Sequence, residues 1–143
     1  MVSGASGAIG ESLMEALGKR GAEIRRLVRS TPMTEHETQW DPSSGTLSPE
    51  TLEGCTSMVN LSGAPIMGRW NEAKKKAILQ SRLQTTELLA QTMAAMDTPP
   101  EVWVCASAVG WYGDTGDRAV DESAPVATDF LADVCGQWEA ATE

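Results

Sequence analysis

Three glycines at three-residue spacing stand within the first ten residues, in the stretch Ser3-Gly4-Ala5-Ser6-Gly7-Ala8-Ile9-Gly10. Where a strand turns into a helix, one glycine permits a tight turn, a second lets the backbone approach a pyrophosphate, and a third allows close packing. The first turn of the helix then offers unpaired N–H groups and a positive dipole end to an anion. The stretch predicts a phosphate-binding turn for a dinucleotide. An ordinary loop rich in glycine and serine is the alternative, and the rest of the chain must decide.

The residues around the glycines have the pattern of a strand, turn, helix and strand. Residues 1–3 resemble the end of a strand, and apolar residues recur at helical spacing from Ile9, with Gly18 and Gly21 expected to end the helix. The run 23–29 is typical of a second, short strand. These segments form the βαβ unit that a dinucleotide-binding turn requires.

Downstream segments continue the alternation of strands and helices. The apolar runs 57–61 and 102–106 predict buried strands that open into loops at their carboxyl ends. Residues 71–96 lack Gly and Pro and predict a long amphipathic helix capped by Asn71. Its apolar side is expected to contain Ala73, Ala77, Ile78, Leu88, Leu89 and Met93.

Shorter elements complete the expected fold. A short edge strand is expected at 39–42, a brief helix opening at 48–50, and a last helix starting near Asp129. The pattern predicts one α/β domain over residues 1–143, a Rossmann-like doubly wound parallel sheet truncated at both ends. We accordingly expect the chain to be a fragment of a longer protein.

Composition narrows the classes of function. With 11 basic and 20 acidic residues the formal net charge is −9, which disfavours nucleic acid as a partner. No stretch is apolar enough to predict a membrane span or an export signal. Three widely spaced cysteines and a single histidine predict reduced thiols, no metal site and a cytoplasmic location.

Several motifs occur in an order that resembles a known family. They are Gly4-x-x-Gly7-x-x-Gly10, Trp40-Asp41-Pro42, Val59-Asn60-Leu61-Ser62-Gly63, Arg69-Trp70-Asn71, Ser81-Arg82-x-x-Thr85-Thr86, Ser107-Ala108-Val109-Gly110-x-Tyr112-Gly113 and Trp138-Glu139-Ala140-Ala141. Together they resemble the N-terminal half of an atypical short-chain dehydrogenase/reductase, of the type called epimerase family protein. The resemblance implies a Rossmann domain that holds a nicotinamide cofactor, followed in the family by a substrate-binding part.

Cofactor contacts are expected from three further places besides the glycine turn with its Ser6 and Ile9. Dinucleotide sites of this type usually carry an acidic residue about 20 residues past the glycines, where it holds the ribose 2′-hydroxyl of NAD. Arg29 stands there instead, and a guanidinium suits a 2′-phosphate, so we predict NADP in preference to NAD. The alternative is a solvated surface charge. Two other contacts with the cofactor are predicted: the small-residue run Leu61-Ser62-Gly63, and Arg82, whose alternative is a salt-bridged helix surface.

Ser107 stands where the resemblance places the substrate-positioning serine of short-chain dehydrogenases, and its hydroxyl would donate to a developing oxyanion. The alternative is that Ser107 caps a helix or turn. Most of that superfamily also uses a Tyr-x-x-x-Lys pair, and this chain has none. Aligning the final helix on its glutamate puts Leu131 and Cys135 at those two places. Tyr112, the only tyrosine, is the remaining phenol in the Ser107 loop, with packing as its alternative role. The tryptophans Trp70, Trp103, Trp111 and Trp138 are most simply core or interface aromatics, and Trp111 alone lies close enough to the Ser107 loop to line a substrate pocket.

Two functions follow from this pattern. The first is an NADP-dependent oxidoreductase or epimerase-like enzyme that acts on a carbonyl or sugar-type small molecule, with an unidentified acid. The second is a non-catalytic NADP-binding sensor or assembly protein, which the missing Tyr-x-x-x-Lys pair favours and the presence of Ser107 disfavours.

Overall fold

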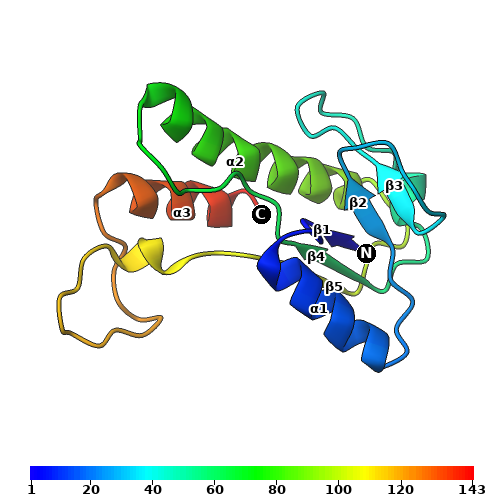
Figure 1. Cartoon of the computed structure of the whole chain (residues 1–143), viewed down its shortest axis with the longest axis horizontal. Helices are drawn as coiled ribbons and strands as arrows, with labels where there is room; N and C mark the ends of the chain where they lie inside the picture. Colours follow the sequence, from blue (N-terminus) through cyan, green and yellow to red (C-terminus); the bar gives the residue numbers. More distant parts are fainter.

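Five parallel strands form one sheet in the computed structural model, which describes residues 1–143 (Figure 1). The strands are β1 (Val2–Ser3), β2 (Arg26–Val28), β3 (Glu37–Gln39), β4 (Ser57–Asn60) and β5 (Val102–Cys105). Their order in the sheet is β3-β2-β1-β4-β5. The chain therefore starts in the middle, moves outward to β3, and returns to the other side of β1. This reversal makes β1 and β4 the switch point of a doubly wound sheet, and the predicted Rossmann-like α/β class is confirmed.

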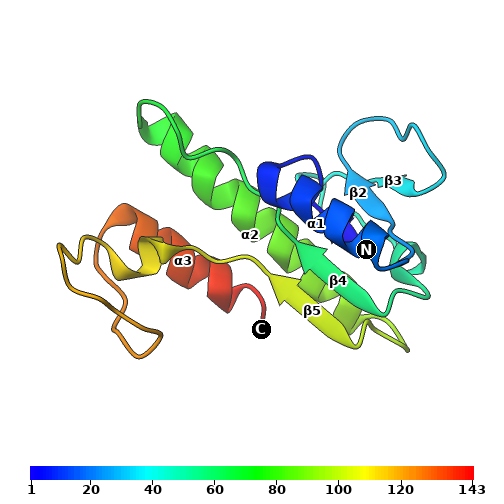
Figure 2. The ribbon, with the colours of Figure 1, turned by 60° about the horizontal axis from the view of Figure 1, so that its bottom comes forward.

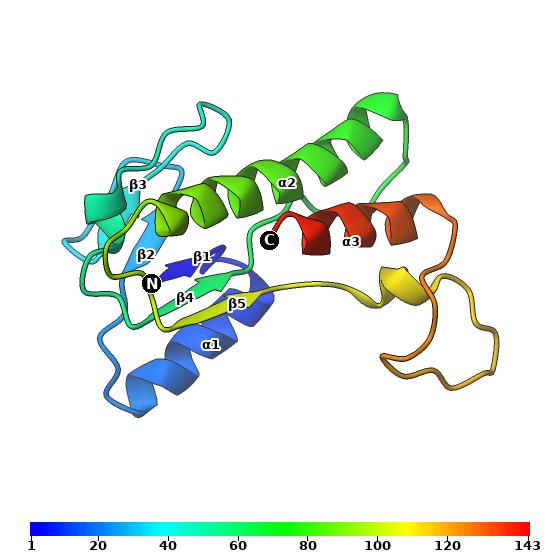
Figure 3. The same ribbon diagram turned by 180° about the vertical axis from the view of Figure 1, so that it is seen from behind.

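Helices cover both faces of the sheet. Helix α1 (Ala8–Lys19) packs on one face, while α2 (Glu72–Ala94) and α3 (Phe130–Ala140) lie side by side on the other (Figures 1 and 3). Two short 3-10 helices, η1 (Pro49–Leu52) and η2 (Val109–Tyr112), interrupt the loops. None of the helices combines the length and apolar character that crossing a membrane would require.

The helix boundaries follow the expected capping residues. Asn71 Oδ1 accepts a hydrogen bond from Lys74 N at 2.8 Å, and Asp129 Oδ1 accepts one from Leu131 N at 2.8 Å. Gly21, with a φ of 75°, follows the end of α1 as predicted. Gly18 was expected to share that role, but it lies inside α1.

The main core lies between the sheet and α2. Its buried members are Met1, Leu27, Trp40, Leu52, Met58, Leu88, Leu89 and Met93. Ala73 and Ala77, expected on the apolar side of α2, are exposed, because the first turns of this helix extend past the sheet (Figure 2). Thr85, Thr86 and Thr92 are buried instead, and the hydroxyl of each has a hydrogen-bond partner within the chain.

Two strands differ from the sequence prediction. The edge strand expected at 39–42 lies earlier, at Glu37–Gln39. The Trp40 N–H still donates to Val28 O at 2.9 Å, but the chain then leaves the sheet and the Trp40 ring is buried. The run 102–106 was expected to be buried on both faces. Val102 and Val104 are 50% and 49% exposed, since no helix of this chain covers their side of β5. An apolar run therefore identified the strand but not which of its faces are covered.

Candidate functional site

The glycine turn connects β1 to α1 at the carboxyl edge of the sheet. Gly4 has a φ of 71°, and a Cβ placed on it would lie 2.6 Å from the carbonyl carbon of Leu61. A Cβ on Gly10 would collide with Gly4 O and lie 2.7 Å from Ala5 Cα. Gly4 therefore permits both the turn and its contact with the loop after β4, and Gly10 lets α1 pack against the turn.

Gly7 has a different environment from the other two glycines. A Cβ placed there would meet only Gly4 O, at 3.5 Å, so the protein itself leaves room for a side chain. Gly7 is also the N-cap of α1, and no side chain caps this helix end. The first-turn N–H groups remain open to a ligand, beside Ser6 and the 72% exposed Ile9.

A buried polar network stands beneath this turn, at the switch point of the sheet. Asn60 Oδ1 accepts hydrogen bonds from Ser3 Oγ at 2.7 Å and from Ser62 N at 3.1 Å. Asn60 Nδ2 donates to Thr86 Oγ1 at 3.0 Å, and Trp138 Nε1 donates to the same oxygen at 3.0 Å. The network joins β1, β4, α2 and α3. Sequence reasoning missed it, although a lone asparagine at the end of an apolar strand was its signal.

Replacing Thr86 with valine tests this network. Trp138 Nε1 would lose its oxygen acceptor, and Asn60 Nδ2 would keep only the Cys105 thiol at 3.7 Å. Because a buried unpaired donor costs roughly 1–3 kcal/mol, we expect the free energy of unfolding to fall by about 2 kcal/mol. Chemical denaturation measures it. Thr85→Val is the control and should be nearly neutral, because the Thr85 hydroxyl bonds only carbonyls of its own helix. Equal losses in the two variants would contradict the network.

Three arginines occur on or near β2, and their side chains have different partners. Arg25 donates to Glu53 O at 2.5 Å and contacts the Cys55 thiol, and Arg26 pairs with Glu37 at 2.9 Å. The Arg29 guanidinium is exposed and has neither a hydrogen bond nor an ion pair within the chain. Because Leu27 pairs with Ser3, Arg29 follows β2 at the level of the glycine turn.

Arg82 is half-buried on α2 and packs against the loop after β4. A Cβ on Gly63 would lie 3.1 Å from Arg82 Cζ. Its Nη1 donates to Ala64 O at 3.2 Å and to Ile78 O at 3.0 Å, and Cζ lies 5.0 Å from the centre of the Trp138 ring. No carboxylate pairs with it, and burial lowers the pKa of the guanidinium. The alternative of a salt-bridged helix surface is therefore wrong.

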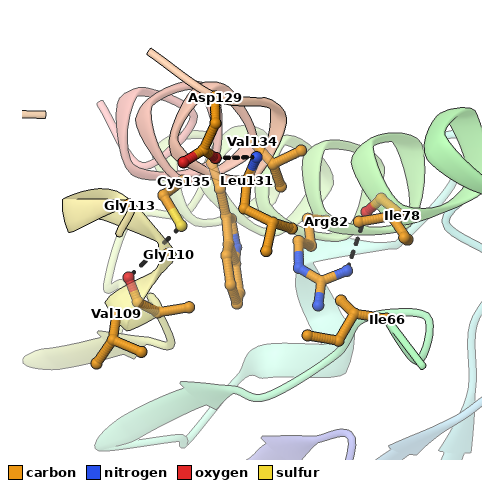
Figure 4. A pocket seen from close by; sticks show the side chains of 12 residues that line it. Ile66, Ile78, Arg82, Val109, Gly110, Gly113, Asp129, Leu131, Val134 and Cys135 are labelled. Carbon is orange, nitrogen blue, oxygen red and sulfur yellow. Dashed lines mark hydrogen bonds between the residues drawn. The ribbon is translucent and has the colours of Figure 1, made fainter. Parts of the chain in front are cut away.

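A pocket of about 330 Å³ lies next to Arg82, between α2, α3 and η2 (Figure 4). Its lining is mostly apolar: Ile66, Ile78, Arg82, Ala108, Val109, Gly110, Gly113, Asp129, Leu131, Val134, Cys135 and Trp138. Trp138 lines it and Trp111 does not, contrary to the sequence prediction; Trp111 packs near Gly136. A second pocket, of about 630 Å³, lies at the opposite edge, near Met1 and Ser57. Ligands of doubly wound sheets bind at the carboxyl edge, so the first pocket is the candidate.

Ser107 follows β5 at the same edge, and its hydroxyl donates to a carboxylate oxygen of Glu139 on α3. Sequence reasoning used Glu139 only to align the helix and did not predict this contact. Tyr112 lies in η2, its hydroxyl has no hydrogen-bond partner, and it is not among the pocket residues. The structure thus brings Glu139, rather than Tyr112, to Ser107.

Leu131 and Cys135, which the alignment on Glu139 predicts at the places of the Tyr-x-x-x-Lys pair, both line the pocket (Figure 4). The Cys135 thiol donates to Ala108 O at 3.5 Å. Burial raises the pKa of this thiol, and the charge of Glu139 raises it further. Cys135 is therefore a neutral, buried thiol and a poor nucleophile.

Comparison with known proteins supports the motifs described above. A model described as the NAD dependent epimerase/dehydratase family matches residues 1–130. An epimerase family protein of Mycobacterium bovis is 40% identical over 142 residues, which cover 99% of this chain and 46% of that protein. A human epimerase family protein is 36% identical over 145 residues, which cover 99% of this chain and 47% of that protein. The chain spans about half the length of the curated relatives it matches.

Solved structures agree with these relatives. The crystal structure of the human epimerase family protein with NADPH has a TM-score of 0.84 at 34% identity, covering 99% of this chain and 48% of that one. A nucleoside-diphosphate sugar epimerase from Corynebacterium glutamicum has a TM-score of 0.83 at 36% identity, covering 99% of this chain and 29% of that one. The fold, the ordered motifs and these matches agree, and the chain belongs to the NAD dependent epimerase/dehydratase family.

Proposed function

We propose that this chain forms the NADP-binding part of an oxidoreductase or epimerase-like enzyme acting on a carbonyl or sugar-type small molecule. The observation that carries the proposal is the unpaired Arg29 guanidinium at the carboxyl end of β2, level with the glycine turn. A free cation there suits a 2′-phosphate, and the human relative was crystallised with NADPH.

The described residues fit such a cofactor. The open N-terminus of α1 at Gly7, beside Ser6, Ile9 and Gly10, would hold the pyrophosphate. The run Leu61-Ser62-Gly63 and Arg82 would lie along the cofactor beyond it, with Ser107 and Tyr112 on the substrate side. The bound cofactor would supply or accept hydride. The protein would bind and orient it, while the apolar pocket would exclude water from the reacting atoms.

Direct binding tests the cofactor preference. We expect the whole protein to bind NADPH more tightly than NADH. Arg29→Gln should raise the dissociation constant of NADPH by at least about tenfold, about 1.4 kcal/mol, and leave that of NADH unchanged. Titration calorimetry measures both dissociation constants. Arg26→Gln is the matched control, because its guanidinium already pairs with Glu37. Equal affinities for the two cofactors, or tighter NADH, would overturn the preference.

The placement of Leu131 and Cys135 in the pocket favours a second candidate, a non-catalytic NADP-binding sensor or assembly protein. Neither side chain can replace the proton-donating pair of the superfamily. A turnover panel separates the two candidates: UDP-glucose, UDP-glucuronic acid, diacetyl and methylglyoxal, followed by cofactor fluorescence. Turnover of any member supports the enzyme. Tight NADPH binding without turnover, together with partner binding that follows the redox state of the cofactor, supports the sensor.

A further inference from the structure

Hydride transfer to or from a carbonyl carbon requires a proton at the neighbouring oxygen, and the usual donor pair is absent from this chain. We propose that Ser107 and Glu139 form a proton relay that replaces it. Ser107 would be the catalytic residue that contacts the substrate oxygen, and Glu139 a positioning residue that stores the proton behind it. This inference rests on the proposed function as an enzyme and identifies the acid that the sequence left unassigned.

Both residues of the pair are connected to the buried network of Asn60 and Thr86 by their neighbours in the chain. Ser107 follows Ala106, whose N–H bonds Asn60 O at 3.0 Å and so extends the pairing of β5 with β4. Glu139 follows Trp138, which is 5% exposed and anchored to the Thr86 hydroxyl. The hydroxyl and the carboxylate are therefore brought together by two fixed backbone segments, which is the arrangement that proton transfer between side chains requires.

No other titratable side chain is hydrogen-bonded to Ser107. The Tyr112 hydroxyl contacts no hydrogen-bonding group, and the Cys135 thiol donates to the Ala108 carbonyl. Glu139 lies one helical turn beyond the pocket residue Cys135 on α3, and it is exposed and, like Ser107, outside the pocket lining. The pair therefore adjoins the pocket through the neighbouring residues Ala108 and Cys135, which do line it.

The direction of the hydrogen bond defines the chemistry. Because Ser107 Oγ donates its proton to the Glu139 carboxylate, its lone pairs are free to accept a proton from an alcohol. In alcohol oxidation the substrate O–H bond breaks and its proton passes to Ser107 Oγ, while the serine proton passes to Glu139. The substrate carbon loses its hydride to a nicotinamide cofactor, so charge and electrons balance. In carbonyl reduction every transfer is reversed, and Glu139 must start protonated.

Glu139→Gln in the whole protein is the informative variant. Glutamine offers an oxygen that accepts the Ser107 hydrogen bond but cannot take up its proton. For the panel member that the parent protein turns over, we expect kcat to fall about 100-fold with little change in KM, because the relay acts on the chemical step and not on substrate binding. The kcat of Ser107→Ala should fall by at least as much. The kcat of the double variant should fall no further, because the two groups act as one unit.

Asp133→Asn is the matched control, since it removes a carboxylate from the same helix that bonds only Gln137. It should retain the parent kcat and KM. The NADPH dissociation constant, measured by fluorescence, should stay within about twofold of the parent in Glu139→Gln. A kcat in this variant close to that of the parent, additive losses in the double variant, or weakened NADPH binding would overturn the relay while leaving the enzyme proposal intact. Absence of turnover by the parent would instead overturn the enzyme proposal, and the relay with it.

Discussion

Gly10→Ala is expected to lower the free energy of unfolding by about 3 kcal/mol, the largest stability loss we predict for a single added methyl group in this chain. The new Cβ would collide with Gly4 O and lie 2.7 Å from Ala5 Cα. Both obstacles are backbone atoms of the turn, so no side chain can rotate away. Either α1 or the turn must move, and the turn is fixed from behind by its contact with Leu61. Urea denaturation measures the loss.

Gly18→Ala provides the control within the same helix. Nothing lies within 4 Å of a Cβ at Gly18, and the residue is exposed inside α1. Alanine loses less conformational entropy than glycine in a helix, so this variant should be more stable than the parent by about 0.5 kcal/mol. The two substitutions should thus change the free energy of unfolding in opposite directions. A small loss in Gly10→Ala would mean that α1 does not pack as closely on the turn as described.

Gly7→Val is expected to keep the fold and abolish cofactor binding. Gly7 has a φ of −83°, which any residue adopts, and a Cβ there meets only Gly4 O at ordinary contact distance. The branched side chain would instead occupy the space before the first turn of α1, where the proposal places the pyrophosphate. We expect the NADPH dissociation constant to rise about 100-fold or more, about 2.7 kcal/mol, with little change in melting temperature.

Gly7→Ala should give an intermediate loss of affinity, because its side chain reaches less far into the same space. Calorimetric titration of both variants with NADPH, next to thermal unfolding curves, separates a binding defect from a folding defect. If folded Gly7→Val bound NADPH as the parent does, the cofactor could not lie against this turn, and the family site would have to be placed elsewhere in the chain.

The main helices and strands and their order along the chain could be predicted from the sequence because short stretches of residues determine them. Asn71 and Asp129 cap helices through their own side chains, and the stretch from Glu72 to Ala94 contains no residue that breaks a helix. Which apolar side chains are exposed depends instead on how the helices pack on the sheet. Ala73 and Val104 are apolar but uncovered, since no periodicity reports where a neighbouring helix stops.

The same division applies to the site. Gly4 and Gly10 were predictable because backbone geometry requires glycine at both positions, and the position of Arg29 followed from its distance past the turn. The contact between Ser107 and Glu139 was not predictable: 32 residues separate them, and only the packing of α3 against α2 and η2 joins them. Trp138 entered the pocket for the same reason, since its partner Thr86 lies on another helix.

The Thr86 hydroxyl has a consequence for how the site is assembled. It accepts from Asn60, which supports the loop after β4, and from Trp138, which precedes Glu139. One oxygen atom therefore links the loop after β4 to the end of α3, the two segments to which we assign the proposed cofactor contacts and the proposed relay. Such a site is preorganised: the cost of alignment is met during folding, and binding energy need not be spent on bringing the two halves together.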